Sequence, residues 1–213
     1  MGDVILRTEN LGISFGGLKA VQDVNIEIKK KQLYGLVGPN GAGKTTLVKL
    51  LLRLYDADGE ICYGARNIKD YKLADYRNMF SAVMQDFHVF ALSVADNVRL
   101  DSKGENDELK IQEAIGKSGL AKKVETFANG WNTLMTKEFD LAGEQMSGGE
   151  QQKLAISHVY YKKSRFVILD EPSSALDPIA EYEMYNRMLD ACKNRGMIFI
   201  SHRLASAVLA DRI

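Results

Sequence analysis

Nine consecutive residues have the types and spacing that bind phosphate. The pattern Gly-x-x-x-x-Gly-Lys-Thr follows a short apolar run, 33–37, and precedes leucines at helical spacing over 47–54. In that setting bare backbone N–H groups point at phosphate oxygens, and the helix N-terminus adds partial positive charge. Lys44 would reach the β and γ phosphates, and the Thr45 hydroxyl would ligate Mg²⁺. We therefore predict a nucleotide loop, with a plain strand-to-helix turn as the alternative, made of Gly38, Pro39, Asn40, Gly41, Ala42, Gly43, Lys44, Thr45 and Thr46.

Two carboxylates follow the apolar run 166–169. Asp170 is placed to hold Mg²⁺ directly or indirectly, and Glu171 to polarise an attacking water. Adjacent acidic residues at the end of a buried strand are costly unless they bind something. An ordinary turn at the strand end is the alternative interpretation.

Polar residues also end two further apolar runs. Gln85 follows 80–84 and His202 follows 197–201. Sheets of α/β proteins bind ligands beyond the carboxyl ends of their strands. Gln85 would then touch Mg²⁺ or the attacking water, and the His202 imidazole would contact the γ-phosphate. The alternatives are a solvated turn residue and a structural histidine.

A second anion site is predicted at the start of a helix running to about residue 163. Its first residues are Ser147, Gly148, Gly149 and Glu150, in which serine and glutamate form a capping box. A well-capped helix is the simpler interpretation, but the two glycines expose backbone amides that bind anions.

Upstream of the nucleotide loop, Phe15 is either an aromatic ring that stacks on adenine or a residue of the hydrophobic core.

The remaining chain must position these residues. The sequence pattern predicts strands over 3–9 and 23–28. It predicts short helices over 94–100, 109–115 and 120–127. We interpret about 86–160 as an inserted helical subdomain whose outer face meets a partner, with crossover helices covering a sheet as the alternative. Lys+Arg 28 against Asp+Glu 28 gives no net charge, which does not suggest a nucleic-acid partner. No apolar run approaches the roughly 18–20 residues that span a bilayer, and two isolated cysteines suggest reduced cytosolic thiols.

Taken in order, these segments resemble the nucleotide-binding domain of ATP-binding cassette (ABC) transporters. The nucleotide loop resembles the Walker A motif, and 166–171 resembles Walker B. The segment 146–150 resembles the LSGGQ signature. Three single residues also match: Gln85 resembles the Q-loop residue, Asp177 the D-loop residue and His202 the switch histidine. The resemblance implies an α/β P-loop NTPase fold with a mixed central sheet, an N-terminal antiparallel β subdomain and an inserted helical subdomain.

The resemblance also implies how the protein works. Two such domains would sandwich two ATP molecules and Mg²⁺ head to tail, and would drive separate transmembrane domains. Each ATP would contact Lys44, Thr45, Gln85, Asp170, Glu171 and His202 of one domain and the signature residues Ser147 and Gly149 of the other. Such a domain lies in the cytoplasm, peripheral to the inner face of the membrane. Cargo and transport direction stay open.

Several features depart from the family pattern. The signature has Met146 and Glu150 where Leu and Gln are usual. The chain stops before the last strands of such domains, so we expect an edge of the sheet to be missing. Residues 1–46 resemble branched-chain amino-acid importer ATPases, whereas 47–213 resemble peptide or multidrug exporter domains, which suggests a mosaic. Alternatives for function are an ATP-binding module without turnover and a non-transport ABC ATPase acting on DNA or ribosomes.

Overall fold

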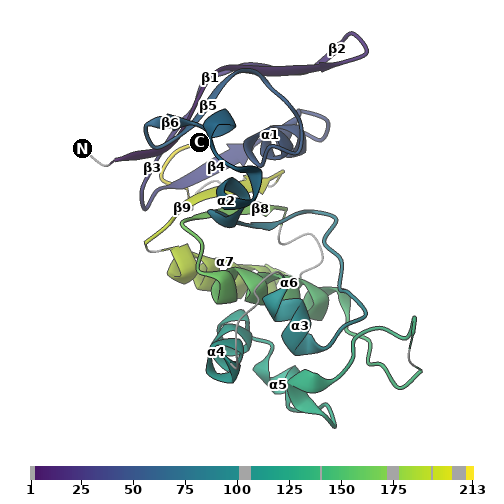
Figure 1. Ribbon diagram of the computed structural model, residues 1–213. Helices are drawn as coiled ribbons and strands as arrows, with labels where there is room; N and C mark the ends of the chain where they lie inside the picture. Colours follow the sequence, from purple (N-terminus) through teal and green to yellow (C-terminus); the bar gives the residue numbers. More distant parts are fainter. Residues whose placement is uncertain (1–2, 101–106, 140, 172–177, 193, 203–209) are drawn as a thin grey trace. The chain divides into compact units, whose positions relative to one another are not determined.

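The computed structural model describes residues 3–100, 107–139, 141–171, 178–192, 194–202 and 210–213. It consists of two compact units, which are described separately. The first unit comprises Met1–Ala82, Ser164–Glu171 and Cys192–Ile213, and the second comprises Val83–Lys163 and Pro172–Ala191. Both β-sheets lie in the first unit, and the second is helical (Figure 1).

An antiparallel sheet forms one layer of the first unit. Its strands are β1 (Val4–Phe15), β2 (Leu18–Val24), β3 (Glu27–Lys29), β5 (Asp58–Tyr63) and β6 (Arg66–Asn67). β1 pairs with β2, β3 and β5. Buried Leu6 and Thr8 alternate with exposed Arg7 and Glu9 along β1, the pattern of a strand with one face against a core.

A second sheet contains the strands that end at the predicted site. Its order is β4 (Leu33–Val37), β9 (Gly196–Ser201), β8 (Phe166–Asp170) and β7 (Phe80–Val83). β9 pairs in parallel with both β4 and β8. Every residue of β8 and β9 is buried, as expected for a parallel sheet covered on both faces. Helix α1 (Lys44–Leu51) follows β4, and α2 (Leu73–Asn78) precedes β7.

Aromatic rings join the elements of the first unit. The Tyr76 ring packs edge-on against Phe80 at 5.0 Å between centroids, and Phe80 packs against Phe166 at 5.5 Å. Tyr63 of β5 contacts both Tyr76 and Phe80. The Tyr76 hydroxyl donates to the Leu51 carbonyl oxygen at 2.6 Å. The antiparallel sheet, α1 and the strands of the parallel sheet therefore share one core.

The second unit is built around α6 (Gly148–Lys162), which packs against α3 (Val94–Arg99) and α4 (Glu108–Ser118). It also contains the short α5 (Ala121–Val124), a 3₁₀ turn (Gly130–Asn132) and most of α7 (Pro178–Cys192). The helices predicted over 94–100, 109–115 and 120–127 are confirmed as α3, α4 and α5. Among helices of the described residues, none has both the length and the hydropathy needed to span a bilayer.

Two sequence-based expectations need correction. The central sheet was expected to be mixed, but the described pairs of β4, β9 and β8 are parallel, and antiparallel pairing belongs to the separate N-terminal sheet. The strand predicted at 23–28 is interrupted between β2 and β3. The Asn25 side chain accepts the Asn10 N–H at 2.7 Å and donates to the Asp23 carbonyl at 2.9 Å. These local bonds replace ladder bonds and break the strand.

Candidate nucleotide-binding site

The carboxyl ends of three strands meet at one edge of the parallel sheet. Val37 at the end of β4 pairs with Ser201 at the end of β9, and Asp170 at the end of β8 pairs with Ile200. The residues that directly follow these strands are Gly38, Glu171 and His202. The register of the buried strands therefore brings the nucleotide loop, the two carboxylates and the histidine to the same edge.

Glycines determine the shape of the nucleotide loop. Gly43 is the N-cap of α1 with a φ of 80°, and a Cβ at this position would lie 2.4 Å from the Ala20 carbonyl oxygen. Gly41 also has a left-handed φ, 81°, but a Cβ there would meet no atom of the described residues within 4 Å. The N–H groups in the first turn of any α-helix lack intrahelical partners, and no side chain among the described residues caps α1. The loop thus offers backbone donors and a positive helix end to an anion.

The first two residues of α1 supply a cation and a hydroxyl. Lys44 Nζ donates to the carbonyl oxygens of Gly38 at 2.7 Å and Pro39 at 2.9 Å, so the ammonium stays within the loop. Thr45 Oγ1 donates to Asp170 Oδ2 at 2.8 Å. Hydroxyl and carboxylate oxygens are ligands that Mg²⁺ prefers. The residues present therefore fit a triphosphate with its Mg²⁺.

Glu171 and His202 form a second polar pair at this edge. Glu171 has a φ of 48°, uncommon outside glycine, and its N–H donates to the Ile200 carbonyl at 3.1 Å. Its Oε1 lies 3.3 Å from His202 Nδ1, and the two side chains are 10% and 45% exposed. A largely buried carboxylate beside a solvent-facing imidazole can orient a water molecule and transfer a proton.

Phe15 lies at the end of β1 with its ring partly exposed. The Tyr55 ring packs edge-on against it at 5.4 Å between centroids, and Lys49 of α1 lies 5.9 Å from the Tyr55 ring. The sequence analysis missed Tyr55 because a single aromatic after a helix has no pattern. An exposed ring held by a second ring is suited to stack on a flat base.

Two other predicted site residues lie outside the described part of the first unit. Gln85 is exposed in a turn just beyond β7, where Phe87 N–H donates to the Met84 carbonyl at 3.2 Å, and it belongs to the second unit. Asp177 lies outside the described residues.

The signature segment begins α6 in the second unit. Ser147 is the N-cap, its Oγ accepts the Glu150 N–H at 3.4 Å, and Glu150 Oε2 accepts the Ser147 N–H at 2.8 Å. The predicted capping box is therefore confirmed. Lys123 of α5, which the sequence analysis missed, lies 3.5 Å from Glu150 Oε1. Lys123 is 27 residues from Glu150 in the sequence. A single ion pair between such distant residues produces no periodic pattern from which it could be predicted.

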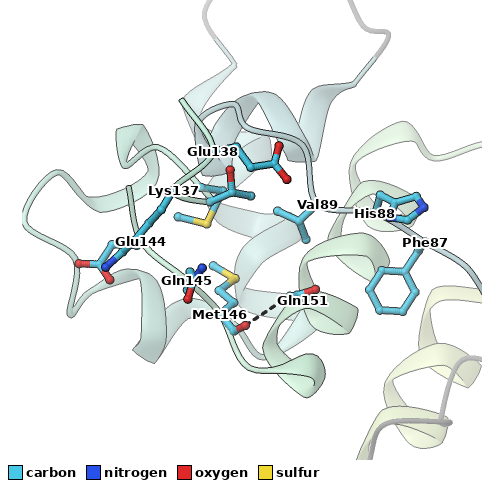
Figure 2. Close-up of a pocket in the computed structure, with 11 residues that line it drawn as sticks. Phe87, His88, Val89, Lys137, Glu138, Glu144, Gln145, Met146 and Gln151 are labelled. Atoms are coloured by element: carbon cyan, nitrogen blue, oxygen red, sulfur yellow. Dashed lines mark hydrogen bonds between the residues drawn. The ribbon is translucent and has the colours of Figure 1, made fainter. Parts of the chain in front are cut away.

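A cavity of about 580 Å³ lies beside the signature segment. Its lining, shown in Figure 2, comes mainly from residues 87–89, 135–138 and 144–146. Gln151 also lines the cavity, and its side-chain amide donates a hydrogen bond to the Met146 carbonyl oxygen at 2.9 Å. The lining mixes charged and apolar side chains. Phe139 and Leu141, next in sequence to this lining, are each 88% exposed. The second unit therefore presents an open, partly apolar surface near the start of α6.

Thr45, Asp170, Glu171 and His202 form a cluster where the strands of the parallel sheet end, which we call the strand-end cluster. Together with the glycine loop before α1, this cluster defines a P-loop ATPase domain. A family model described as "ABC transporter" matches residues 21–174, and the chain belongs to this family. It is an ABC-type ATPase domain.

Similar proteins are considerably longer than this chain. It is 36% identical over 201 residues to the subtilin transport ATP-binding protein SpaT of Bacillus subtilis, covering 92% of this chain and 32% of that protein. It is 32% identical over 195 residues to the ATP-dependent lipid A-core flippase of Vibrio cholerae serotype O1, covering 91% and 33%. The chain thus spans about a third of these relatives.

A solved structure, "Structure of a bacterial Atm1-family ABC exporter with ATP bound", superposes with a TM-score of 0.87 at 25% identity. The superposition covers 98% of this chain and 36% of that one. Because the superposition covers 98% of this chain and the match to SpaT covers 92%, both include most of residues 1–46 as well, and the comparisons give no support to a mosaic or to an importer-like N-terminal segment.

Proposed function

We propose that the chain binds and hydrolyses MgATP as the ATP-binding domain of an exporter. The observation that carries the proposal is the strand register, which places the glycine loop, the Thr45–Asp170 pair and the Glu171–His202 pair at one edge. The named similarity to an ABC exporter with ATP bound supports export over import. Residues 1–213 would form one such domain, with about 86–160 as its helical part.

The chemistry follows from the positions of the side chains. Lys44 and the N–H groups of the loop bind the phosphates, and Phe15 stacks on the adenine. Thr45 and Asp170 would hold Mg²⁺, with Gln85 as the further ligand expected from the sequence, and the ion would supply positive charge to the phosphates. Glu171 orients the attacking water in line with the γ-phosphate and accepts its proton. His202 holds Glu171 and contacts the γ-phosphate.

A second copy would complete each site. Ser147 and Gly148 at the start of α6 are exposed, and the Ser147 hydroxyl and the Gly148 and Gly149 amides would bind the γ-phosphate held by a partner domain. Asp177 would lie at the interface between the copies. ATP would therefore drive a head-to-tail dimer, and hydrolysis would separate it.

The transmembrane domains would dock on the second unit, which places the chain in the cytoplasm at the inner membrane face. The cavity beside the signature segment, with exposed Phe139 and Leu141 next to it, supports this location. The names of the two relatives specify different cargoes, subtilin and lipid A-core, at similar identity. Cargo choice is therefore a property of the membrane domains. Balanced charge gives no support to a nucleic-acid partner.

The test is phosphate release with MgATP across a range of chain concentrations. We expect release to rise more than linearly with protein, because two copies form each site. Glu171→Gln should lower the rate about 10²–10⁴-fold, since it removes the general base but keeps the shape of the side chain. ATP should still raise the melting temperature of that variant.

Two results would contradict the proposal. Unchanged release in Glu171→Gln would remove this residue from the reaction. No release by the wild-type chain, with ATP still raising its melting temperature, would make the chain a binding module without turnover.

A further inference from the structure

The acidic residue of the signature segment creates an electrostatic conflict. Glu150 lies in the first turn of α6, and its Oε2 accepts the Ser147 N–H at 2.8 Å. The positive end of a helix attracts carboxylates and phosphates alike. A fixed negative charge in the first turn therefore repels the phosphate that the proposed function brings there. An uncharged glutamine at this position would form the same cap without the repulsion.

A neighbouring lysine can offset this charge. Lys123 Nζ lies 3.5 Å from Glu150 Oε1, so the two carboxylate oxygens have separate partners, the ammonium and the Ser147 N–H. The side chains of Lys123 and Glu150 are 34% and 28% exposed, so solvent and salt screen the pair less than they would a fully exposed one. The Lys123 ammonium also lies 5.5 Å from the Phe127 ring, which helps to fix the side chain.

The titration behaviour of Glu150 agrees with this arrangement. Partial burial by itself raises the pKa of the carboxyl group. Hydrogen bonds with Ser147 and the charge of Lys123 outweigh that effect and hold the pKa below its usual value. Glu150 is therefore ionised at neutral pH, and Lys123 is a cation placed beside that charge.

We propose that Lys123 is a positioning residue that neutralises Glu150 and so keeps the start of α6 able to accept the γ-phosphate of a nucleotide on a second copy. The inference rests on the proposed function. Lys123 acts through Glu150 and contacts no reacting atom. It is needed because residue 150 is acidic, so a chain with glutamine there does not depend on it.

The experiment compares MgATP titrations of phosphate release by the full chain and four variants. Lys123→Met keeps the apolar stem and removes the charge, and Lys123→Arg keeps the charge. Lys122→Met, on the exposed neighbouring position of α5, is the matched control. The fourth variant combines Lys123→Met with Glu150→Gln. Melting curves show whether each variant is folded.

We expect Lys123→Met to raise the half-saturating ATP concentration roughly two- to fivefold, the scale of one partly exposed ion pair. The rate at saturating ATP should change little, and the difference should shrink as salt rises. Lys123→Arg and Lys122→Met should match the wild type. Addition of Glu150→Gln should restore the wild-type half-saturation, which a purely structural role of Lys123 would not produce.

The proposal is overturned if Lys123→Met matches Lys122→Met, or if Glu150→Gln gives no rescue. A different failure is possible: the wild-type chain itself releases no phosphate at any protein concentration. That result would refute the proposed function first, and the role of Lys123 with it.

Discussion

The two regions proposed to bind anions are built by different means. At the strand-end cluster, Thr45 meets Asp170 and Glu171 meets His202, and these contacts depend on the register of buried parallel strands. At the signature segment, Ser147 and Glu150 satisfy each other across three residues. The first region requires the folded sheet, whereas the second needs one helical turn. Mutations should therefore act through tertiary packing in the first and through local helix stability in the second.

The largest effect, a loss of ATP affinity, is expected where the nucleotide loop lies against β2. In Gly43→Ala the new Cβ would meet the Ala20 carbonyl at 2.4 Å, with φ at 80°. Backbone strain alone costs about 1–3 kcal/mol, so ATP should bind roughly 10–100-fold more weakly by calorimetry. Gly41→Ala has the same kind of φ in open space and should lose less. Equal losses in the two variants would show that the contact with Ala20 has no influence.

A smaller effect is expected at the local cap. Ser147→Ala removes the acceptor for the Glu150 N–H and should lower the free energy of unfolding by about 0.5–2 kcal/mol. Chemical denaturation followed by circular dichroism measures this loss. Ser147→Thr keeps the hydroxyl and should recover most of the stability. If Thr were as destabilising as Ala, side-chain volume rather than capping would explain the result.

The smallest effect tests whether the helical unit also depends on contacts distant in sequence. The Tyr161 hydroxyl donates to Asp107 Oδ2 at 2.5 Å, and this bond holds the pKa of Asp107 below its usual value. A lowered folded-state pKa stabilises the protein above the unfolded pKa of about 4 and ceases to do so as pH falls through the folded value. Tyr161→Phe should therefore cost about 1 kcal/mol at pH 7 and less below about pH 4.

Tyr160→Phe is the matched control for this prediction. The Tyr160 hydroxyl donates to the Arg187 carbonyl at 2.6 Å, an acceptor that does not titrate. Its loss should be the same at both pH values when unfolding is followed by denaturant titration. A parallel pH dependence in both variants would show that Asp107 is not the source.

Much of the site could be predicted because its residues follow recognisable elements. Apolar runs identified the strands, and the polar residues after them identified Asp170, Glu171 and His202, which the register then gathers. Tyr55 and Lys123 could not be predicted, because each acts through one contact between segments distant in sequence. The break between β2 and β3 was missed because the alternation of Val24, Ile26 and Ile28 concealed the side-chain bonds of Asn25.

The contact between Ala20 and Gly43 also limits how the gene can vary in length. Ala20 lies in β2, a few residues after the tight turn at Gly16 and Gly17, where Phe15 pairs with Leu18. A codon inserted or deleted in this turn would move a different carbonyl toward the nucleotide loop, although no motif residue had changed. Homologues should therefore keep the length of the β1–β2 hairpin constant.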